Sequence, residues 1–479
     1  MAATKITTTA VTNATATTME KKKTTVLALP VEIMILILGS LPINDRKNTR
    51  LVSRQWYWYS SSPSIARGEK FVIRGGRNSA DEISESIRQT NILRQSIEFS
   101  DLTIRDLSRK MWRVCNEVCH LIFRDCYFSS SDLQNVLFWC PKLRSIALNY
   151  GSPFDGFRAA KLARVLQSFA DNGVERSEMR ELSISVKDCM DTFVFGKIFE
   201  IFPNLRMIRV NGNSFANEVP AGEAISRTEI RLERLILLDH PFRFESLRYS
   251  GLTELDIPVT EAQSTGPRKE GFLHFLSSQS RLTVVKLEMK KVSCQAMVKE
   301  TIFTVLRHQA LRDFSVSSPA EVSFSSEDVE RLITSVKKLR CLTLDVFISA
   351  EWLPPASPNM PAMIEELVLK NGSYEGENKI YSHLLVHCPS LKDLRFANPT
   401  ALVLSEILET KQNLERLTLS AYPVIGGNAA ATFAQQQFSM EKLSKLKTLK
   451  IQDPDKVLFT DDFVKRMIGE TKIADVEIA

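Results

Sequence analysis

One six-residue pattern recurs along most of the chain and restricts what the chain can fold into. A large aliphatic residue is followed by two variable residues, an aliphatic residue, one variable residue and a last apolar residue, as in Leu143-x-x-Ile146-x-Leu148. The alternation that ends the pattern is typical of a β-strand with one buried face. Copies start at residues 94 (a degenerate copy), 118, 143, 179, 205, 232, 252, 282, 311, 339, 364, 391, 414, 446 and 473.

The spacing of these fifteen copies indicates a leucine-rich-repeat solenoid. Successive starts lie 20 to 36 residues apart, and the average of about 27 falls within the range of that repeat, in which a strand is followed by a returning helix. We therefore predict an α/β fold, in which a curved parallel sheet carries helices on its outer face. An all-helical solenoid is the alternative, and the period-two alternation argues against it.

Helical patterns fill several of the segments between the copies. Residues 158–170 carry Leu162, Val165, Leu166 and Phe169 on one helical face. Ser325-x-x-Asp328 has the form of a capping box that opens another helix. Similar patterns predict helices around residues 293–308, 376–387 and 460–469.

The most apolar stretch of the chain lies near its N-terminus. Pro30 and Glu32 suit the first turn of a helix, and six large apolar residues follow at 33–38. A helix that is apolar on every side must be covered on several sides, and a domain of about 40 residues buries too little surface to do so. We expect another polypeptide to cover it. An ordinary core helix is the alternative, whereas a transmembrane helix needs about 20 apolar residues.

A second helical pattern follows, in which Val52, Trp56 and Tyr59 are predicted to share one face. Together the two segments resemble the F-box, the helical module by which substrate receptors of ubiquitin ligases dock on an Skp-type adaptor. The residues that carry the resemblance are Leu29, Pro30, Glu32, Ile33, Ile37, Leu38, Leu41, Pro42, Asp45, Leu51, Val52 and Trp56. Arg46 and Lys47 depart from the family, in which leucines often follow the aspartate.

This resemblance implies a set of adaptor-binding residues. They are Leu29, Pro30, Glu32, Ile33, Ile37, Leu38, Leu41, Val52 and Trp56. The resemblance and the repeats predict three regions: a disordered Thr/Ala/Lys tail at 1–25, an all-α F-box-like domain at 26–68 and the solenoid at 69–479. Residues 71–73 are a candidate bridging strand, and the last copy ends at Ile478 with a strand edge that nothing in the sequence protects.

The variable residues of each copy should face the concave side, because side chains alternate along a strand. Around residues 207–286 they combine apolar residues with arginines, a mixture favoured at binding hot spots. The candidate substrate-binding residues are Met207, Arg209, Arg234, Ile236, Leu238, Glu254, Asp256, Val284 and Lys286. An exposed Ile236-x-Leu238 is expected there, and the irregular stretches at 212–230 and 422–439 are candidate binding loops.

Patterns of catalytic and metal-binding chemistry are missing from the sequence. The eight cysteines include no Cys-x-x-Cys pair and lie among apolar residues, as buried reduced thiols do. His383-x-x-x-His387 lacks the glutamate of a zinc-protease helix, and Cys115-x-x-x-Cys119-His120 lacks a second ligand pair. We predict no catalytic residue, no metal and no cofactor. The net charge of +6 is too mild for a nucleic-acid footprint, and no membrane contact is expected.

The chain is thus similar to F-box proteins of the leucine-rich-repeat class. That resemblance implies a non-catalytic substrate-recognition subunit of an Skp–cullin–F-box ubiquitin ligase, located in the cytoplasm or nucleus. The F-box would hold the adaptor and, through it, the cullin and RING subunits, while the repeats would hold a protein substrate destined for proteasomal degradation. The alternatives are an interaction scaffold without ligase output and a repeat receptor for a small ligand. Substrate identity, any prior modification of the substrate and the oligomeric state are left open.

Overall fold

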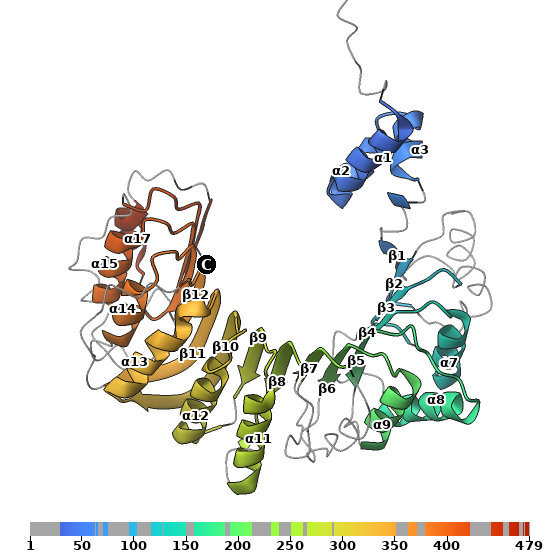
Figure 1. Cartoon of the computed structure of the whole chain (residues 1–479). Coiled ribbons are helices and arrows are strands. Elements are labelled where there is room, and N and C mark those ends of the chain that lie inside the picture. Colours follow the sequence, from blue (N-terminus) through green and yellow to red (C-terminus); the bar gives the residue numbers. More distant parts are fainter. Residues whose placement is uncertain are drawn as a thin grey trace, which may run out of the picture. The chain divides into compact units, whose positions relative to one another are not determined.

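The fold is taken from a computed structural model of the chain (Figure 1). It describes residues 29–62, 64–65, 70–74, 95–102, 116–127, 129–149, 158–186, 192–212, 231–238, 251–261, 266–289, 292–350, 363–370, 379–421, 442–453, 459–468, 473 and 475–478. The predicted tail at 1–25 lies outside these ranges, as do the candidate loops at 212–230 and 422–439 apart from Gly212. The chain divides into two compact units: the first contains Met1–Glu69 and Ile92–Arg94, and the second contains Lys70–Asn91 and Gln95–Ala479.

The first unit contains three short helices around a small apolar core. They are α1 (Val31–Ser40), α2 (Ile43–Thr49) and α3 (Arg54–Ser60). Met34 and Leu38 of α1 are fully buried together with Ile65. Pro30 directly precedes α1 and Glu32 lies in its first turn, as the sequence predicted from the helix dipole and the missing proline N–H.

The second helical segment differs from the prediction, because it is broken in two. Residues 50–53 form a turn between α2 and α3, and the hydroxyl of Ser53 accepts a hydrogen bond of 3.2 Å from the N–H of Trp56. This N-cap starts α3 after Val52. Val52 is therefore exposed in the turn, while Trp56 and Tyr59 pack against the core, so the predicted common face of the three residues is wrong.

The second unit contains a single parallel sheet in which the strands follow one another in chain order from β1 to β16 (Figure 1). The strands are β1 (Lys70–Arg74), β2 (Ser96–Ser100), β3 (His120–Arg124), β4 (Ser145–Asn149), β5 (Glu181–Val186), β6 (Met207–Gly212), β7 (Arg234–Leu238), β8 (Glu254–Pro258), β9 (Val284–Glu288), β10 (Asp313–Phe324), β11 (Cys341–Ala350), β12 (Glu366–Lys370), β13 (Asp393–Ala397), β14 (Arg416–Ser420), β15 (Thr448–Gln452) and β16 (Asp475–Ile478). The fifteen sequence copies supply β2 to β16, and the candidate bridging strand is part of β1.

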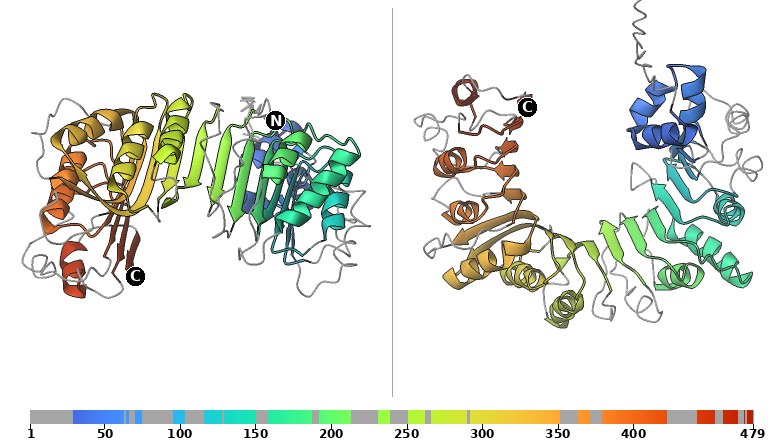
Figure 2. Two further views of the ribbon diagram at one scale, coloured as in Figure 1. Left: turned by 90° about the horizontal axis from the view of Figure 1, so that it is seen from below. Right: turned by 45° about the horizontal axis from the view of Figure 1, so that its top comes forward.

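Helices return the chain between many of these strands. They are α7 (Ser130–Trp139), α8 (Ala159–Asp171), α9 (Thr192–Ile201), α11 (Gly266–Ser278), α12 (Gln295–Leu306), α13 (Ser326–Ser335), α14 (Lys379–Val386), α15 (Ala401–Thr410) and α17 (Asp461–Ile468), with a 3-10 turn at Val336–Lys338. All of them lie on one face of the sheet (Figure 2). We call the opposite face, which these helices leave uncovered, the open face. The predicted α/β leucine-rich-repeat fold with a small helical region ahead of it is confirmed.

The repeat pattern sets the register of the sheet. Its aliphatic residues point toward the helices and are buried, as Leu342 and Leu344 are in β11. The carbonyl before each of the strands β2 to β14 accepts two N–H groups from the next repeat, as Thr283 does from Arg312 and Asp313 at 2.9 and 3.0 Å. Because these repeats use the same main-chain contact, their strands stack in register.

The predicted capping box at Ser325 is confirmed. The Ser325 hydroxyl accepts from the N–H of Asp328 at 3.3 Å, and the Asp328 carboxylate accepts from the N–H of Ser325 at 2.8 Å. The Lys299 ammonium also pairs with this carboxylate. Burial alone would raise the pKa of Asp328, but its hydrogen bonds with Lys299 and Ser325 hold the pKa below its ordinary value.

Candidate protein-docking surfaces

Helix α1 presents an apolar surface on the side opposite its core. Met34 and Leu38 are fully buried, whereas Ile33, Leu36 and Ile37 are 42%, 69% and 42% exposed. This separation follows from the helical period of 3.6 residues, because an unbroken apolar run places residues on every side of the helix. We call Ile33, Leu36 and Ile37 the α1 ledge. Leu36 was not among the predicted site residues, although its place on the helix could have identified it.

A second apolar surface comes from the α2–α3 turn and from α3. Leu51 and Val52 are exposed in the turn, and Tyr57 and Trp58 are exposed on α3. The two aromatic rings meet edge to face, with centroids 6.4 Å apart. The prediction missed Tyr57 and Trp58 as surface residues because it placed Trp56, which packs against the core, on the binding side.

The predicted adaptor-binding residues therefore differ in their surroundings. Pro30, Glu32, Ile33, Ile37 and Val52 are exposed. The other four are directed toward the core of the first unit: Leu29, Leu41 and Trp56 are half-buried and Leu38 is fully buried.

In the second unit, strands β6 to β9 bring the candidate substrate-binding residues together on the open face. The register forms one row of Met207, Arg234, Glu254 and Val284 and a second row of Arg209, Ile236, Asp256 and Lys286. Leu238 lies two residues beyond Ile236 on β7, beside Asn211. Side chains on neighbouring strands at equivalent positions are close enough to act on one partner.

Arg234 connects the three strands β5, β7 and β8. Its Nη2 lies 3.1 Å from Oε1 of Glu181 on β5, and its Nη1 lies 3.8 Å from Oε2 of Glu254 on β8. To reach β5 from β7, the guanidinium extends across β6, where Met207 occupies the equivalent position. Arg234 is thus held in one orientation by two carboxylates.

The expectation that Ile236 is exposed is wrong. Its side chain is 9% exposed, and Leu238 is half-buried. Ile236 lies between Arg209 and Asp256 in the register, so the neighbouring strands place a polar side chain on each side of it.

Asp256 is an unusual carboxylate at the centre of this surface. Burial raises its pKa above the ordinary value, and the negative charges of Glu254 and Glu288 add to that effect. Lys286 and Arg209 act in the opposite direction without cancelling it. A cation brought by a partner would stabilise the ionised form of Asp256.

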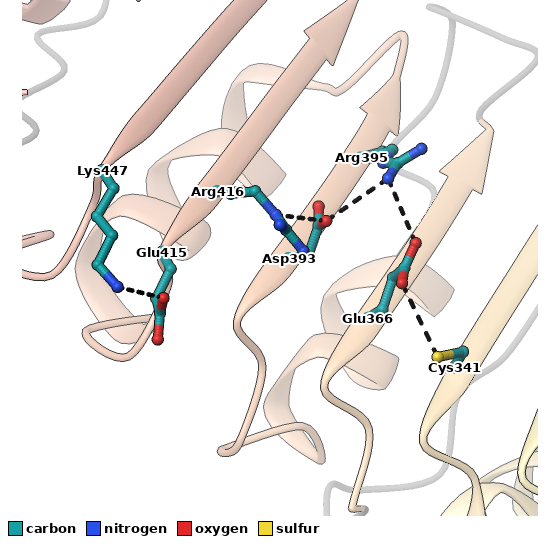
Figure 3. Close-up of polar contacts among 7 residues, drawn as sticks. All are labelled: Cys341, Glu366, Asp393, Arg395, Glu415, Arg416 and Lys447. Carbon is teal, nitrogen blue, oxygen red and sulfur yellow. Dashed lines mark hydrogen bonds and ion pairs between the residues drawn. The ribbon is translucent and has the colours of Figure 1, made fainter. Parts of the chain in front are cut away.

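From β11 to β15, ion pairs connect neighbouring repeats across the open face (Figure 3). Arg395 lies between two carboxylates, with its Nη2 3.4 Å from Glu366 and 3.6 Å from Asp393. Nε of Arg416 lies 2.8 Å from Oδ2 of Asp393, and Nζ of Lys447 lies 2.6 Å from Oε2 of Glu415. The Arg395–Asp393 pair lies within β13, and the other pairs join oppositely charged residues of adjacent repeats.

Cys341 lies at one end of this network. Its thiol is 3.9 Å from Oε2 of Glu366 and is half-buried (Figure 3). Burial, a contact with the Asp313 carboxylate and the charge of Glu366 raise the pKa of Cys341 to about 12. The side chain is therefore a neutral thiol near neutral pH and a poor nucleophile.

The histidine and cysteine motif at 387–388 is built into the core. Both side chains are buried, and the Cys388 thiol donates to the carbonyl of Leu384 at 3.2 Å. Within the described ranges, no three His, Cys, Asp or Glu side chains are grouped so as to hold a metal ion. No helix among the described residues is long and apolar enough to cross a membrane.

Comparison with known protein families identifies one domain in the chain. Residues 26–62 match the F-box domain family. No curated protein matches the chain. F-box domains generally bind Skp1-type adaptors.

Similar solved structures include a complex of TLR13 with ssRNA13, with 14% identity and a TM-score of 0.46 over 85% of this chain and 54% of that one. A leucine-rich repeat protein from Bacteroides thetaiotaomicron has 9% identity and a TM-score of 0.38 over 77% and 50%. The yeast Rad7–Elc1 complex has 12% identity and a TM-score of 0.35 over 83% and 91%. The chain spans about half the length of the first two.

The matched domain coincides with the first unit, whose three helices leave an apolar ledge exposed. The repeat pattern and the sixteen-stranded parallel sheet define the second unit. The chain thus combines an F-box domain with a leucine-rich-repeat solenoid.

Proposed function

We propose that this chain is the substrate-recognition subunit of an Skp–cullin–F-box E3 ubiquitin ligase. The α1 ledge is the observation that carries the proposal: Ile33, Leu36 and Ile37 are exposed on a helix inside a matched F-box domain. Full burial of a large aliphatic side chain contributes about 1.5–3 kcal/mol, so covering these three partly exposed side chains gives a share of that value each and favours docking of a partner. An Skp-type adaptor is the partner that the F-box implies.

In this proposal the chain makes and breaks no covalent bond. The adaptor connects it to cullin and RING subunits, and the open face of the repeats holds a protein substrate, with Arg209, Arg234, Asp256 and Lys286 as its central charged residues. Holding both partners on one chain replaces a bimolecular encounter by a nearly intramolecular one, so ubiquitin transfer is favoured by effective concentration.

Adaptor capture tests the first half of the proposal. The full chain is purified with an Skp-type adaptor and a cullin, beside the variant Ile33→Asp with Ile37→Asp. Both substituted side chains are exposed, so we expect adaptor and cullin to be lost while circular dichroism is unchanged. Phe138→Asp is the matched control, because Phe138 is an exposed apolar residue on α7 of the second unit. Undiminished capture by the double variant removes the ligase function.

Substrate recovery tests the second half. The variant Arg209→Ala with Arg234→Ala changes none of the buried aliphatic residues of the pattern, and thermal unfolding of the variant checks that the sheet is kept. Proximity labelling under proteasome inhibition should lose the substrate and keep the adaptor. A chain lacking residues 26–62 should keep substrate labelling and lose the adaptor. Equal substrate labelling by the double variant and the unchanged chain would place the substrate site elsewhere.

A further inference from the structure

The last strand of the sheet, β16, differs from the preceding strands in its burial. In β15 the two inward residues, Leu449 and Ile451, are 0% and 1% exposed, whereas their equivalents in β16, Val476 and Ile478, are 38% and 58% exposed. All four residues of β16 are exposed. Among the described residues, β16 pairs with β15 and no strand lies along its other edge.

An edge of this kind can accept another strand. The outward N–H and C=O groups of an edge strand form a template for main-chain hydrogen bonds with an added strand. Covering its exposed apolar side chains also lowers the free energy, because apolar surface is removed from water. In every interior repeat the next strand covers the equivalent aliphatic residues. Any strand added to β16 in the register of the sheet would place two of its side chains beside Val476 and Ile478.

The charges of β16 indicate which strand fits. Asp475 and Glu477 alternate with the two apolar residues and share the open face with Thr448 and Lys450. Opposite charges already meet between neighbouring repeats in this part of the sheet: Arg416 pairs with Asp393, and Lys450 pairs with Glu477 at 2.7 Å. A strand added beyond β16 would continue this pairing of opposite charges if it placed cationic side chains beside the carboxylates of Asp475 and Glu477.

We propose that β16 is a docking edge for an extended segment of a partner protein in which basic and aliphatic residues alternate. The segment adds as a parallel strand, its aliphatic side chains cover Val476 and Ile478, and its lysines or arginines lie beside Asp475 and Glu477. This docking edge is independent of the adaptor surface and of the proposed ligase function.

A fluorescein-labelled peptide probe tests the proposal on the full chain. The probe contains Lys-Val-Lys-Ile flanked by glycine and serine, and the control peptide contains the same residues as Lys-Lys-Val-Ile. The two peptides carry equal charge, so a difference between them reports alternation. Fluorescence anisotropy should give a dissociation constant about tenfold lower for the alternating peptide. Equal affinities would mean that nonspecific charge attraction accounts for binding and would overturn the proposal.

A charge exchange provides the second arm. Asp475→Lys should weaken binding of the Lys-Val-Lys-Ile probe about tenfold and favour a Glu-Val-Lys-Ile probe instead. Glu409→Lys introduces the same change on an exposed residue of α15 and should leave both affinities unchanged. An unaltered preference in Asp475→Lys contradicts the proposed register. A concentration-dependent dimer that Ile478→Asp abolishes would instead assign the edge to a second copy of this chain.

Discussion

Nε of Arg416 lies 2.8 Å from Oδ2 of Asp393, a carboxylate whose side chain is 4% exposed in the middle of the open face. Asp393 also lies 3.6 Å from Nη2 of Arg395, so two exposed guanidiniums on two strands share one buried carboxylate (Figure 3). A buried charge is stable when it is paired and hydrogen-bonded. The pairing of β13 with β14 thus includes an electrostatic contact as well as the main-chain ladder.

Asp393→Asn should destabilise this part of the sheet. The amide keeps the shape of the carboxylate but removes the charge that both arginines contact, at a cost of about 1–3 kcal/mol. Hydrogen exchange of β13 and β14 amides should become faster, with little change at β4 and β5. Glu415→Gln is the control, because the Glu415–Lys447 pair is exposed and should matter less. If the β13 and β14 amides exchange at the same rate in Asp393→Asn and in the unchanged chain, the main-chain hydrogen bonds alone hold these two strands together.

Glu98 should make the stability of the first repeats depend on pH. Its carboxylate lies 2.6 Å from Nζ of Lys70 on β1 and 3.5 Å from Nε of Arg124 on β3. Burial would raise the pKa of Glu98, but the contacts with Lys70, Arg124 and Ser100 hold it below the ordinary value.

A carboxyl whose folded-state pKa is depressed stabilises the fold above its unfolded pKa, and that stabilisation is lost as pH falls through the folded value. Glu98→Gln should therefore unfold more easily than the unchanged chain at about pH 7, and the difference should shrink toward about pH 3. Denaturant titrations across this range provide the measurement. A difference that stays constant with pH would assign the effect to side-chain shape rather than charge.

Met34→Ala should separate folding of the F-box helices from docking by their outer side. Met34 is fully buried in the small core of the first unit, and removing its side chain should cost about 2–5 kcal/mol. Because that core is small, we expect α1 to detach and adaptor capture to fall at 37 °C. Leu36→Ala shortens an exposed side chain and should weaken capture without altering thermal unfolding. A Met34 variant with unchanged unfolding would contradict the assigned core.

The repeat pattern was sufficient to predict the sheet, because burial of one side of a strand requires alternation in the sequence itself. The aliphatic residues that the pattern places in β3 to β15, such as Leu367 and Leu369, are buried, whereas Val476 and Ile478 of β16 are exposed. The break between α2 and α3 was missed, although Ser53 three residues before Trp56 is an N-cap signal. The apolar spacing of Val52, Trp56 and Tyr59 predicted one continuous helix, although Ser53 indicated that a helix begins after it.

Contacts between repeats were beyond prediction for a different reason. Arg234 pairs with Glu181, which lies 53 residues earlier and two strands away, and nothing local to either residue indicates the other. Ile236 looked exposed because alternation alone assigns it to the open face. Its burial depends on which side chains the adjacent strands place beside it, here Arg209 and Asp256, and these neighbours are known only when the register is known.

Lys411 should make the stability of the C-terminal repeats depend on pH in the alkaline range. Its ammonium is 6% exposed and donates to the carbonyl of Leu385 at the end of α14. Burial lowers the pKa of Lys411 below its ordinary value of 10.5, while the charges of Cys388 and Glu406 act against that shift. Between the folded-state pKa and 10.5 the unfolded chain binds more protons than the folded chain, so stability increases with pH in that interval.

Lys411→Met removes this titration and keeps a side chain of similar length. Denaturation midpoints measured from about pH 7 to pH 10 should therefore rise in the unchanged chain relative to the variant. Parallel curves for the two proteins would mean that the buried ammonium titrates alike in the folded and unfolded states.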